Sequence, residues 1–450
     1  MTCRGGFAYA SFGTTRNLFP QWRQQMKPTV STIFVLMAVV LSAQQPISLD
    51  DALKMALKSH PRVREAEQLV EAAHARRRQL LAEFAPFLAM HSVGSEGRGD
   101  TGFMSMLEPS RMFMLPRDAF FAASLTFQWR IFTSARDAAA RDVGGFEVRE
   151  AEQALALARL QVAYRVRKAF AEAAYRTEAV AAYEAGLLAA EEMESLAKAR
   201  FEEGKIPEAF LFAAQAQTAR ARRDLRIAEA DLEASIAELG AAVGGGLRDG
   251  ARPGDWRAQQ LPDTLESALG EAYDRRPELL AERARARRQG AEAEMARRSA
   301  LPELSVFGTQ ITFGSERGGS SSNATVGLLL TMPLADGGMR RARASEATAG
   351  GLAAESRLGA ALLDVAVEVR AAWARRSAVP DVLRHAEAEL QASEEAYRIA
   401  RLRFDVGKAV HAEVQVVLAD LIAARVAVAE ARRFDRNAEA DLLRALGRQP

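Results

Sequence analysis

Cysteine is almost absent from this sequence, which has 450 residues and a single thiol at Cys3. One cysteine forms no internal disulfide and has no second thiol with which to build a metal site. The five histidines are scattered, and no two have the spacing of metal ligands on a helix. The sequence therefore predicts neither a disulfide framework, nor a metal centre, nor a cofactor.

An excess of one charge and a catalytic motif are also missing. The 60 basic and 58 acidic residues leave a net charge of +2, so nucleic acid is not an expected partner. There is no phosphate loop, no Gly-x-Ser-x-Gly and no nucleophile beside a base. Acidic pairs such as Glu191-Glu192 lie in highly charged segments, where a solvated helix face is the usual explanation. We therefore expect that the protein is not an enzyme.

No stretch approaches the roughly 20 apolar residues of a membrane-spanning helix. A shorter apolar run, Ile33 to Leu41, follows Lys27 and ends at Ser42-Ala43. This pattern is typical of a secretory signal, so residues 1–43 are interpreted as leader and signal peptide, with Met26 as a possible true start. The alternative is the start of a buried amphipathic helix.

Proline is absent between Ser134 and Arg200, and alanine-rich apolar spacing runs through this segment. These features predict a helix of roughly 100 Å. A return helix is expected after the sequence Phe201-Glu-Glu-Gly-Lys205, and Phe404-Asp-Val-Gly-Lys408 echoes this sequence. The predicted pairs of long and return helices are 134–200 with 206–243, and 337–403 with 409–446. Pro380 predicts a kink or bulge in the second long helix.

The echo belongs to a repeat of the whole sequence. Pro61 and Pro277 each follow a short predicted helix and lie 216 residues apart, whereas Gly204 and Gly407 lie 203 apart. Such regular offsets indicate two copies of one structural unit. The predicted organisation is a first repeat over 44–243, a linker over 244–262 and a second repeat over 263–450.

Beyond each helix that ends at proline, the apolar period changes from 3.6 to 2. Residues 121–131 alternate apolar with polar side chains, at the length that a tilted strand needs to cross a bilayer. The predicted strands are 87–95, 120–131, 303–313 and 324–334, joined by loops over 95–119 and 314–323. Three aromatic residues at one strand end are assigned to an interfacial girdle, with a buried core role as the alternative: Phe127, Trp129 and Phe132.

Four amphipathic strands cannot close a membrane barrel alone, because the outer two would leave unpaired backbone groups in lipid. Two chains would give eight strands and three would give twelve, and both numbers suit closed barrels. The long alanine-rich helices likewise lack a thick apolar face, so they are expected to line a hollow helical cylinder.

This order of elements, performed twice, resembles the TolC-like outer-membrane efflux protein family. The pieces that carry the resemblance are Leu49-Asp-Asp-Ala-Leu with Pro61, Trp129-Arg-Ile-Phe, Pro333-Leu-Ala-Asp-Gly-Gly and the two glycine-containing tips. The resemblance implies a mainly α fold with a transmembrane β part, in which a homotrimer forms a 12-stranded β-barrel and a periplasmic α-helical barrel.

The same resemblance implies a passive exit duct in the outer membrane of a Gram-negative bacterium, serving efflux or type I secretion. Its implied partners are outer-membrane lipid, a periplasmic adaptor (membrane fusion) protein and an inner-membrane pump. The tips would contact the adaptor, which assigns that role to Gly204, Lys205, Gly407 and Lys408.

A narrow end ringed by carboxylates is a further feature that the resemblance implies. One such position falls on Glu413, with Phe210 as its equivalent in the first copy and Glu208 as a substitute. A second acidic position falls on Val416, so the predicted constriction is partly apolar. The alternative for Glu413, as for the tip lysines, is a solvated side chain.

A different class of protein shares the long helices. A periplasmic or secreted coiled-coil interaction protein without a pore would have the same rods. It would not need strands of bilayer length or aromatic residues clustered at their ends.

Overall fold

The computed structural model describes residues 46–95, 120–245, 247, 251–315 and 319–449, and residues 46–450 form one compact unit. The expected signal peptide and nearly all of the loop expected over 95–119 lie outside the described residues.

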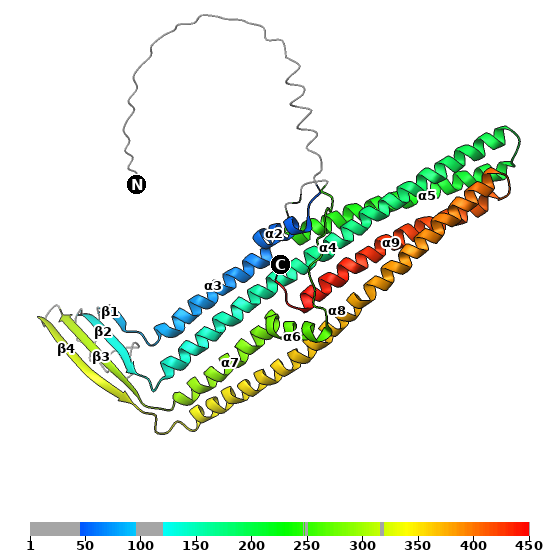
Figure 1. Cartoon of the computed structure of the whole chain (residues 1–450). Helices are drawn as coiled ribbons and strands as arrows, with labels where there is room; N and C mark the ends of the chain where they lie inside the picture. Colours follow the sequence, from blue (N-terminus) through cyan, green and yellow to red (C-terminus); the bar gives the residue numbers. More distant parts are fainter. Residues whose placement is uncertain (1–45, 96–119, 246, 248–250, 316–318, 450) are drawn as a thin grey trace, which may run out of the picture. The chain divides into compact units, whose positions relative to one another are not determined.

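The same order of helices and strands occurs twice along the chain (Figure 1). The first pass consists of α2 (Leu49–Ser59), α3 (Pro61–Ala82), β1 (Phe87–Ser95), β2 (Phe120–Phe132), α4 (Arg136–Glu202) and α5 (Glu208–Val243). The second consists of α6 (Leu265–Arg275), α7 (Pro277–Arg298), β3 (Glu303–Ser315), β4 (Gly319–Thr331), α8 (Met339–Asp405) and α9 (His411–Ala445).

The short helices begin at side-chain caps. The hydroxyl of Ser48 accepts a hydrogen bond from the backbone N–H of Asp51, and Thr264 accepts one from Ser267. Pro61 and Pro277 are the first residues of α3 and α7, where the missing N–H costs nothing. The chain therefore turns between a short and a longer helix at the same place in both repeats.

The four strands form one antiparallel sheet in the order β1-β2-β3-β4. The expected range of the fourth strand, 324–334, was wrong, because β4 begins at Gly319 and ends at Thr331. Residues 319–323, expected in a loop for their glycine and serine content, pair with β3 up to Asn323 opposite Ile311. Pairing uses backbone groups, so a neighbouring strand overrides weak side-chain propensity. Past Thr331 the chain leaves the ladder before Pro333, which has no N–H to donate.

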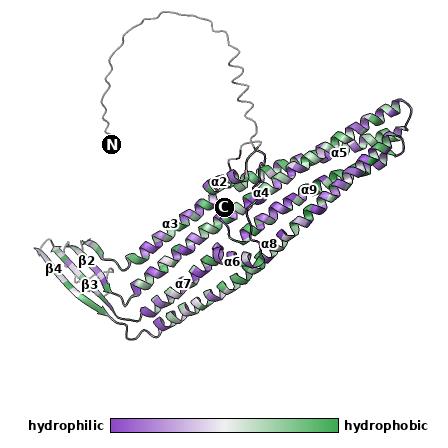
Figure 2. Ribbon diagram, in the orientation of Figure 1, coloured by the Kyte–Doolittle hydropathy of each residue, from purple (hydrophilic) through white to green (hydrophobic). Residues whose placement is uncertain are grey.

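The long helices pack side by side in one layer (Figure 1). On the half that leads to the sheet the order is α3-α4-α7-α8, and on the half that leads to the tips it is α5-α4-α9-α8. Figure 2 shows apolar and polar residues alternating along these helices, which have no continuous apolar segment. No helix in the described part of the chain is both long and apolar enough to cross a membrane.

Two equivalent hydrophobic cores lie where the short helices pack on the long ones. In the first, Val63 packs with Val162, Val166 and Leu239. In the second, the positions that correspond to these four are all apolar and again lie together: Leu279, Val365, Val369 and Leu442.

The linker between the repeats also packs against both of them. Trp256 packs against the first core, 6.1 Å from the ring of Phe170, and its indole N–H donates to Glu439 of α9 over 2.9 Å. The linker therefore attaches the last helix of the second repeat to the core of the first.

Pro380 does not interrupt α8, which stays α-helical from Met339 to Asp405. The helix is therefore not broken at Pro380, and the expected kink or bulge stays a prediction.

A glycine with a positive φ ends the return helix in both repeats. At Gly244 (φ +92°) a Cβ atom would lie 2.9 Å from the Cα of His60, and at Gly447 (φ +71°) it would lie 2.8 Å from the Cα of Arg276. Only glycine allows the helix end to approach the X-Pro junction so closely.

We expect Gly244→Ala to lower the free energy of unfolding by about 1–3 kcal/mol, because strain and a backbone clash add. The matched control is Gly270→Ala in α6, where an added Cβ meets no atom within 4 Å. Denaturant unfolding followed by circular dichroism measures both. Equal stability of the two variants would contradict the close packing at His60.

Candidate functional site at the sheet and the helix tips

The three predicted girdle residues share one face of β2. Trp129 lies opposite Val306, Phe127 opposite Gly308 and, after a bulge at Ile131, Phe132 opposite Leu304. Directly paired residues of an antiparallel sheet point to the same side. The bulge therefore returns Phe132 to the side of Phe127 and Trp129, which strict alternation would not have done. Trp129 and Phe132 are exposed and Phe127 is half-buried, so the core alternative does not apply to the first two.

The apolar face continues onto the neighbouring strands. Leu88 of β1 pairs with Phe127, and Val306 of β3 pairs with Leu328 of β4. Val326 is 81% exposed and Leu328 is 67% exposed, so within the described residues this face is an uncovered apolar band. The opposite face carries the row Thr126, Thr309 and Thr325.

Both helix tips are closed by a glycine in the left-handed region. Gly204 has φ +71° and Gly407 has φ +74°. The backbone N–H of Lys205 donates to the carbonyl of Arg200 over 2.9 Å, and that of Lys408 donates to Arg403 over 2.7 Å. These bonds satisfy the last carbonyls of α4 and α8 and leave both lysine side chains exposed. Lys205 also pairs with Glu203 over 2.7 Å.

The two tips differ in how they pack. Phe404 is 8% exposed and lies in a cluster with Met193 of α4 and Val414 of α9. Its equivalent Phe201 is 36% exposed. The guanidinium of Arg200, on α4, lies 4.5 Å from the centre of the Phe404 ring, a cation–π contact that joins the first hairpin to the second.

The predicted constriction residues do not form one cluster within the chain. Glu208 and Phe210 lie exposed in the first turn of α5, whereas Glu413 lies in the first turn of α9. Glu413 is half-buried and pairs with Arg403 of α8 over 2.9 Å. No hydrogen bond or ion pair of the described residues joins Glu413 to Glu208 or Phe210.

Sequence reasoning missed His411, the first residue of α9. Its side chain is 6% exposed, its Nδ1 is buried without a hydrogen-bond partner, and its Nε2 lies 2.6 Å from the side-chain amide of Gln415. Burial lowers the pKa of His411. The sequence did contain a pointer to His411, because the repeat offset aligns it with Glu208. Each return helix therefore begins with a titratable side chain, an acid in the first repeat and a base in the second.

An ion-pair network joins three helices farther from the tips. Glu172 of α4 accepts from Arg433 of α9 and from Arg176, each over 2.8 Å, and Arg176 pairs with Asp231 of α5 over 2.6 Å. Arg433 also lies 4.4 Å from the Tyr175 ring centre. Burial opposes ionisation of Glu172, but the two arginine hydrogen bonds prevail and hold its pKa below the usual value.

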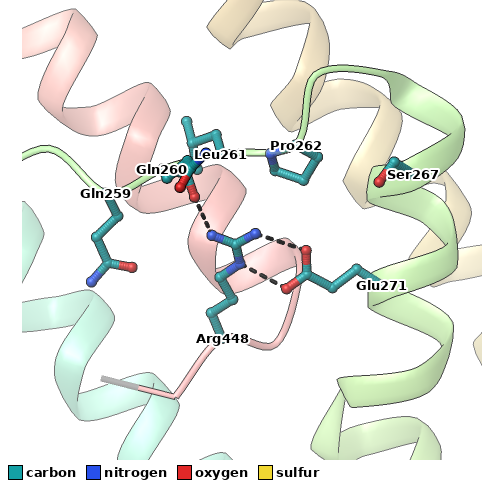
Figure 3. Close-up of a pocket in the computed structure, with 7 residues that line it drawn as sticks. All are labelled: Gln259, Gln260, Leu261, Pro262, Ser267, Glu271 and Arg448. Atoms are coloured by element: carbon teal, nitrogen blue, oxygen red, sulfur yellow. Dashed lines mark hydrogen bonds and ion pairs between the residues drawn. The ribbon is translucent and has the colours of Figure 1, made fainter.

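An open polar groove of about 510 Å³ lies beside the C-terminal segment (Figure 3). Arg448 crosses it to both carboxylate oxygens of Glu271, over 2.7 and 2.8 Å, and also donates to the carbonyl of Gln260. The hydrogen bond from Arg448 holds the pKa of Glu271 below its usual value. These bonds fasten the end of the chain to α6 and to the linker.

A metal site is not formed among the described residues, where no three histidine, cysteine or carboxylate side chains converge.

We expect Phe404→Ala to loosen the second tip strongly, since truncation of a buried phenylalanine costs about 3–5 kcal/mol. Phe201→Ala, at the equivalent exposed position, is the matched control and should have a much smaller effect. Hydrogen–deuterium exchange of the peptides around both tips measures the difference. Equal exchange in the two variants would contradict the asymmetry of the tips.

The sequence model of the family described as "outer membrane efflux protein" matches residues 52–245 and 268–448, well over half of the chain. The outer membrane protein OprJ of Pseudomonas aeruginosa is 30% identical over 203 residues. That match covers 42% of this chain and 41% of OprJ, so the chain spans less than half the length of this relative.

Solved structures show the same fold. The outer membrane protein VceC of Vibrio cholerae superposes with a TM-score of 0.73 at 20% identity, over 89% of this chain and 96% of that one. The CmeC outer membrane channel of Campylobacter jejuni gives 0.74 at 19% identity, over 89% and 85%. The MtrE outer membrane channel of Neisseria gonorrhoeae, in its open state, gives 0.71 at 18% identity, over 89% and 88%. Together with the duplicated order of elements and the apolar face of the sheet, these matches show that the chain belongs to the outer membrane efflux protein family, TolC-like channel proteins of the outer membrane that extend into the periplasm.

Proposed function

We propose that this protein is the exit duct of a tripartite efflux pump or a type I secretion system, and that it conducts substrates passively across the outer membrane. The observation that carries the proposal is the open four-stranded sheet, which has an apolar face and in which, among the described residues, β1 and β4 each pair with one strand only. In lipid such a sheet must pair with further copies, because each unmade backbone hydrogen bond costs several kcal/mol.

The helices support a ring in which each copy meets the next head to tail. One edge of the unit is formed by β1, α3 and α5, and the other by β4 and α8. Both edges carry exposed apolar side chains: Leu69, Phe212 and Ile227 on the first, and Leu352, Leu363 and Val367 on the second. Two different surfaces that meet repeatedly form a closed ring when the rotation allows it.

Three copies suit a duct better than two. A closed barrel of eight strands is filled by its own side chains, whereas larger barrels leave a lumen. Three copies of a four-stranded sheet give twelve strands, so we propose a homotrimer with a 12-stranded β-barrel and a helical barrel below it. In this barrel Phe127, Trp129 and Phe132 belong to the aromatic girdle that faces lipid.

The tips are the proposed site of gating and of contact with a partner. The exposed Lys205 and Lys408, positioned by Gly204 and Gly407, face away from the membrane end and are proposed to contact a periplasmic adaptor, itself fed by an inner-membrane pump. Glu413, Phe210 and Glu208 are proposed to line the constriction that the ring forms there. The Arg403–Glu413 pair holds α8 to α9 and supports a closed tip.

The protein purified in detergent is expected to give small, cation-preferring channels in a planar bilayer, and Glu413→Ala should raise their conductance. A partly exposed ion pair contributes about 0.2–1 kcal/mol, so its loss shifts the open-to-closed ratio by up to about fivefold. Phe210→Ala should widen the same constriction, and Glu229→Ala, which breaks an ion pair with Arg226 on α5, is a control away from the tip. No conductance, from protein that is extracted without detergent, would support the coiled-coil alternative.

The edge pairing can be tested with introduced cysteines, since the chain has one native cysteine, replaced here as Cys3→Ser. We expect Met90→Cys in β1 together with Val326→Cys in β4, and neighbouring pairs along the strands, to cross-link one copy to the next. The oxidised product should migrate as a trimer on a denaturing gel. Either cysteine alone should give monomer, and a ladder beyond three copies would contradict the trimer.

A further inference from the structure

His411 lies at the junction of the two hairpins, next to the second tip. Its surroundings are Ala190 and Met193 of α4, Ala214 and Gln217 of α5, and Val414, Gln415 and Leu418 of its own helix. They enclose a cavity of about 10 Å³, the space of a single water molecule. The imidazole is therefore the side chain through which the first turn of α9 packs on α4, at a cavity that α5 also lines.

This environment fits a neutral imidazole and opposes an imidazolium. Nδ1 is buried without a partner, the ring lies 6.0 Å from that of Phe404, and the residue stands at a helix N-terminus, where the positive end of the dipole disfavours a cation. No residue lining the cavity carries a charge. Burial accordingly lowers the pKa of His411.

The charged groups of the surrounding elements do not supply a carboxylate for an imidazolium. Glu413 of α9 is paired with Arg403 of α8, and Glu192 of α4 with Arg401 of α8. Arg200 of α4 lies against the Phe404 ring and adds positive charge to the same junction. A protonated His411 therefore gains solvation only by leaving its cavity.

We propose that His411 is a pH-sensitive contact between the hairpins, and that its protonation moves the ring to water, loosens the first turn of α9 from α4 and α5, and favours the open tip. This inference rests on the proposed duct function. The closed junction accommodates the neutral form of His411. The stabilisation of the closed junction by this side chain is therefore complete above about pH 6.5 and is lost as the pH falls through the lowered pKa.

The test compares wild type with His411→Phe, which fills the cavity without titrating, at about pH 7.5 and about pH 5. His411→Gln is a second variant that stays neutral, should the larger ring not fit. His60→Asn is the matched control, because His60 is also buried with a lowered pKa but caps α3, away from the tips. Asparagine keeps a capping oxygen there.

Two readouts are measured on each detergent-purified protein. Hydrogen–deuterium exchange of the peptide that covers the first turns of α9, corrected for intrinsic rates, should rise about threefold to tenfold at the lower pH, because protonation disfavours the closed junction. Bilayer conductance should rise in parallel. Both responses should persist in His60→Asn and vanish in the two His411 variants.

The outcomes separate this inference from the duct itself. Exchange that depends on His411 without conductance at either pH would refute the duct function while leaving the pH-sensitive contact in place. Conductance in all variants with an unchanged acid response in His411→Phe and His411→Gln would overturn the role of His411 and leave the duct intact.

Discussion

In the part of the chain that the structure describes, the outer edges of β1 and β4 have no neighbouring strand, and this open sheet constrains the rest of the molecule. A four-stranded sheet that is stable against lipid must complete its ladder with another copy, and it then forces the same closure on whatever continues its strands. Here α3 leads into β1 and α8 follows β4, so the helices at the edges of the layer are those attached to the unpaired strands. In the proposed assembly, closure of the barrel would therefore also close the helical ring.

The proposed helical ring would need helices that pack closely and evenly, and the apolar residues of the single chain are distributed in a way that suits this. Alanine supplies much of the buried surface along α4 and α8, since its small side chain lets helix backbones approach. Large buried side chains are concentrated in the two cores where the short helices pack. The middle of the molecule therefore has the strongest packing, and the tips depend on a few particular contacts such as those of Phe404.

Much of this fold could be predicted from the sequence because duplication supplies two readings of every element. The offsets of 216 and 203 residues placed Pro61 with Pro277 and Gly204 with Gly407, and both of these glycines have a left-handed backbone angle in the structure. The start of β4 was wrong because serine and glycine carry little strand propensity, and only the neighbouring β3 reveals that residues 319–323 pair. Local pattern does not record a tertiary partner.

The site was less predictable for the same reason. Side chains such as Glu413 were recognised by position, but neither its pairing with Arg403 nor the burial of His411 is visible until α4, α8 and α9 are placed together. A histidine without a second ligand nearby gave no metal signal. His411 could have been singled out only by comparison with Glu208, its counterpart in the other repeat.

Differences between equivalent positions show how the two hairpins have taken separate roles. At the X-Pro junction, His60 accepts a hydrogen bond from the N–H of Arg62, whereas Arg276 extends to Glu278 and Glu368. The counterpart of Glu368 in the first repeat is Arg165, so at this junction the buried arginine stands in the copy that supplies carboxylates, as desolvation requires. At the tips, by contrast, the buried titratable residue His411 has no carboxylate beside it, and its counterpart Glu208 is exposed to solvent. The second return helix is thus attached at its far end through Glu439 and Trp256, whereas its first turn is held by the buried His411 and Val414 and by the Arg403–Glu413 pair.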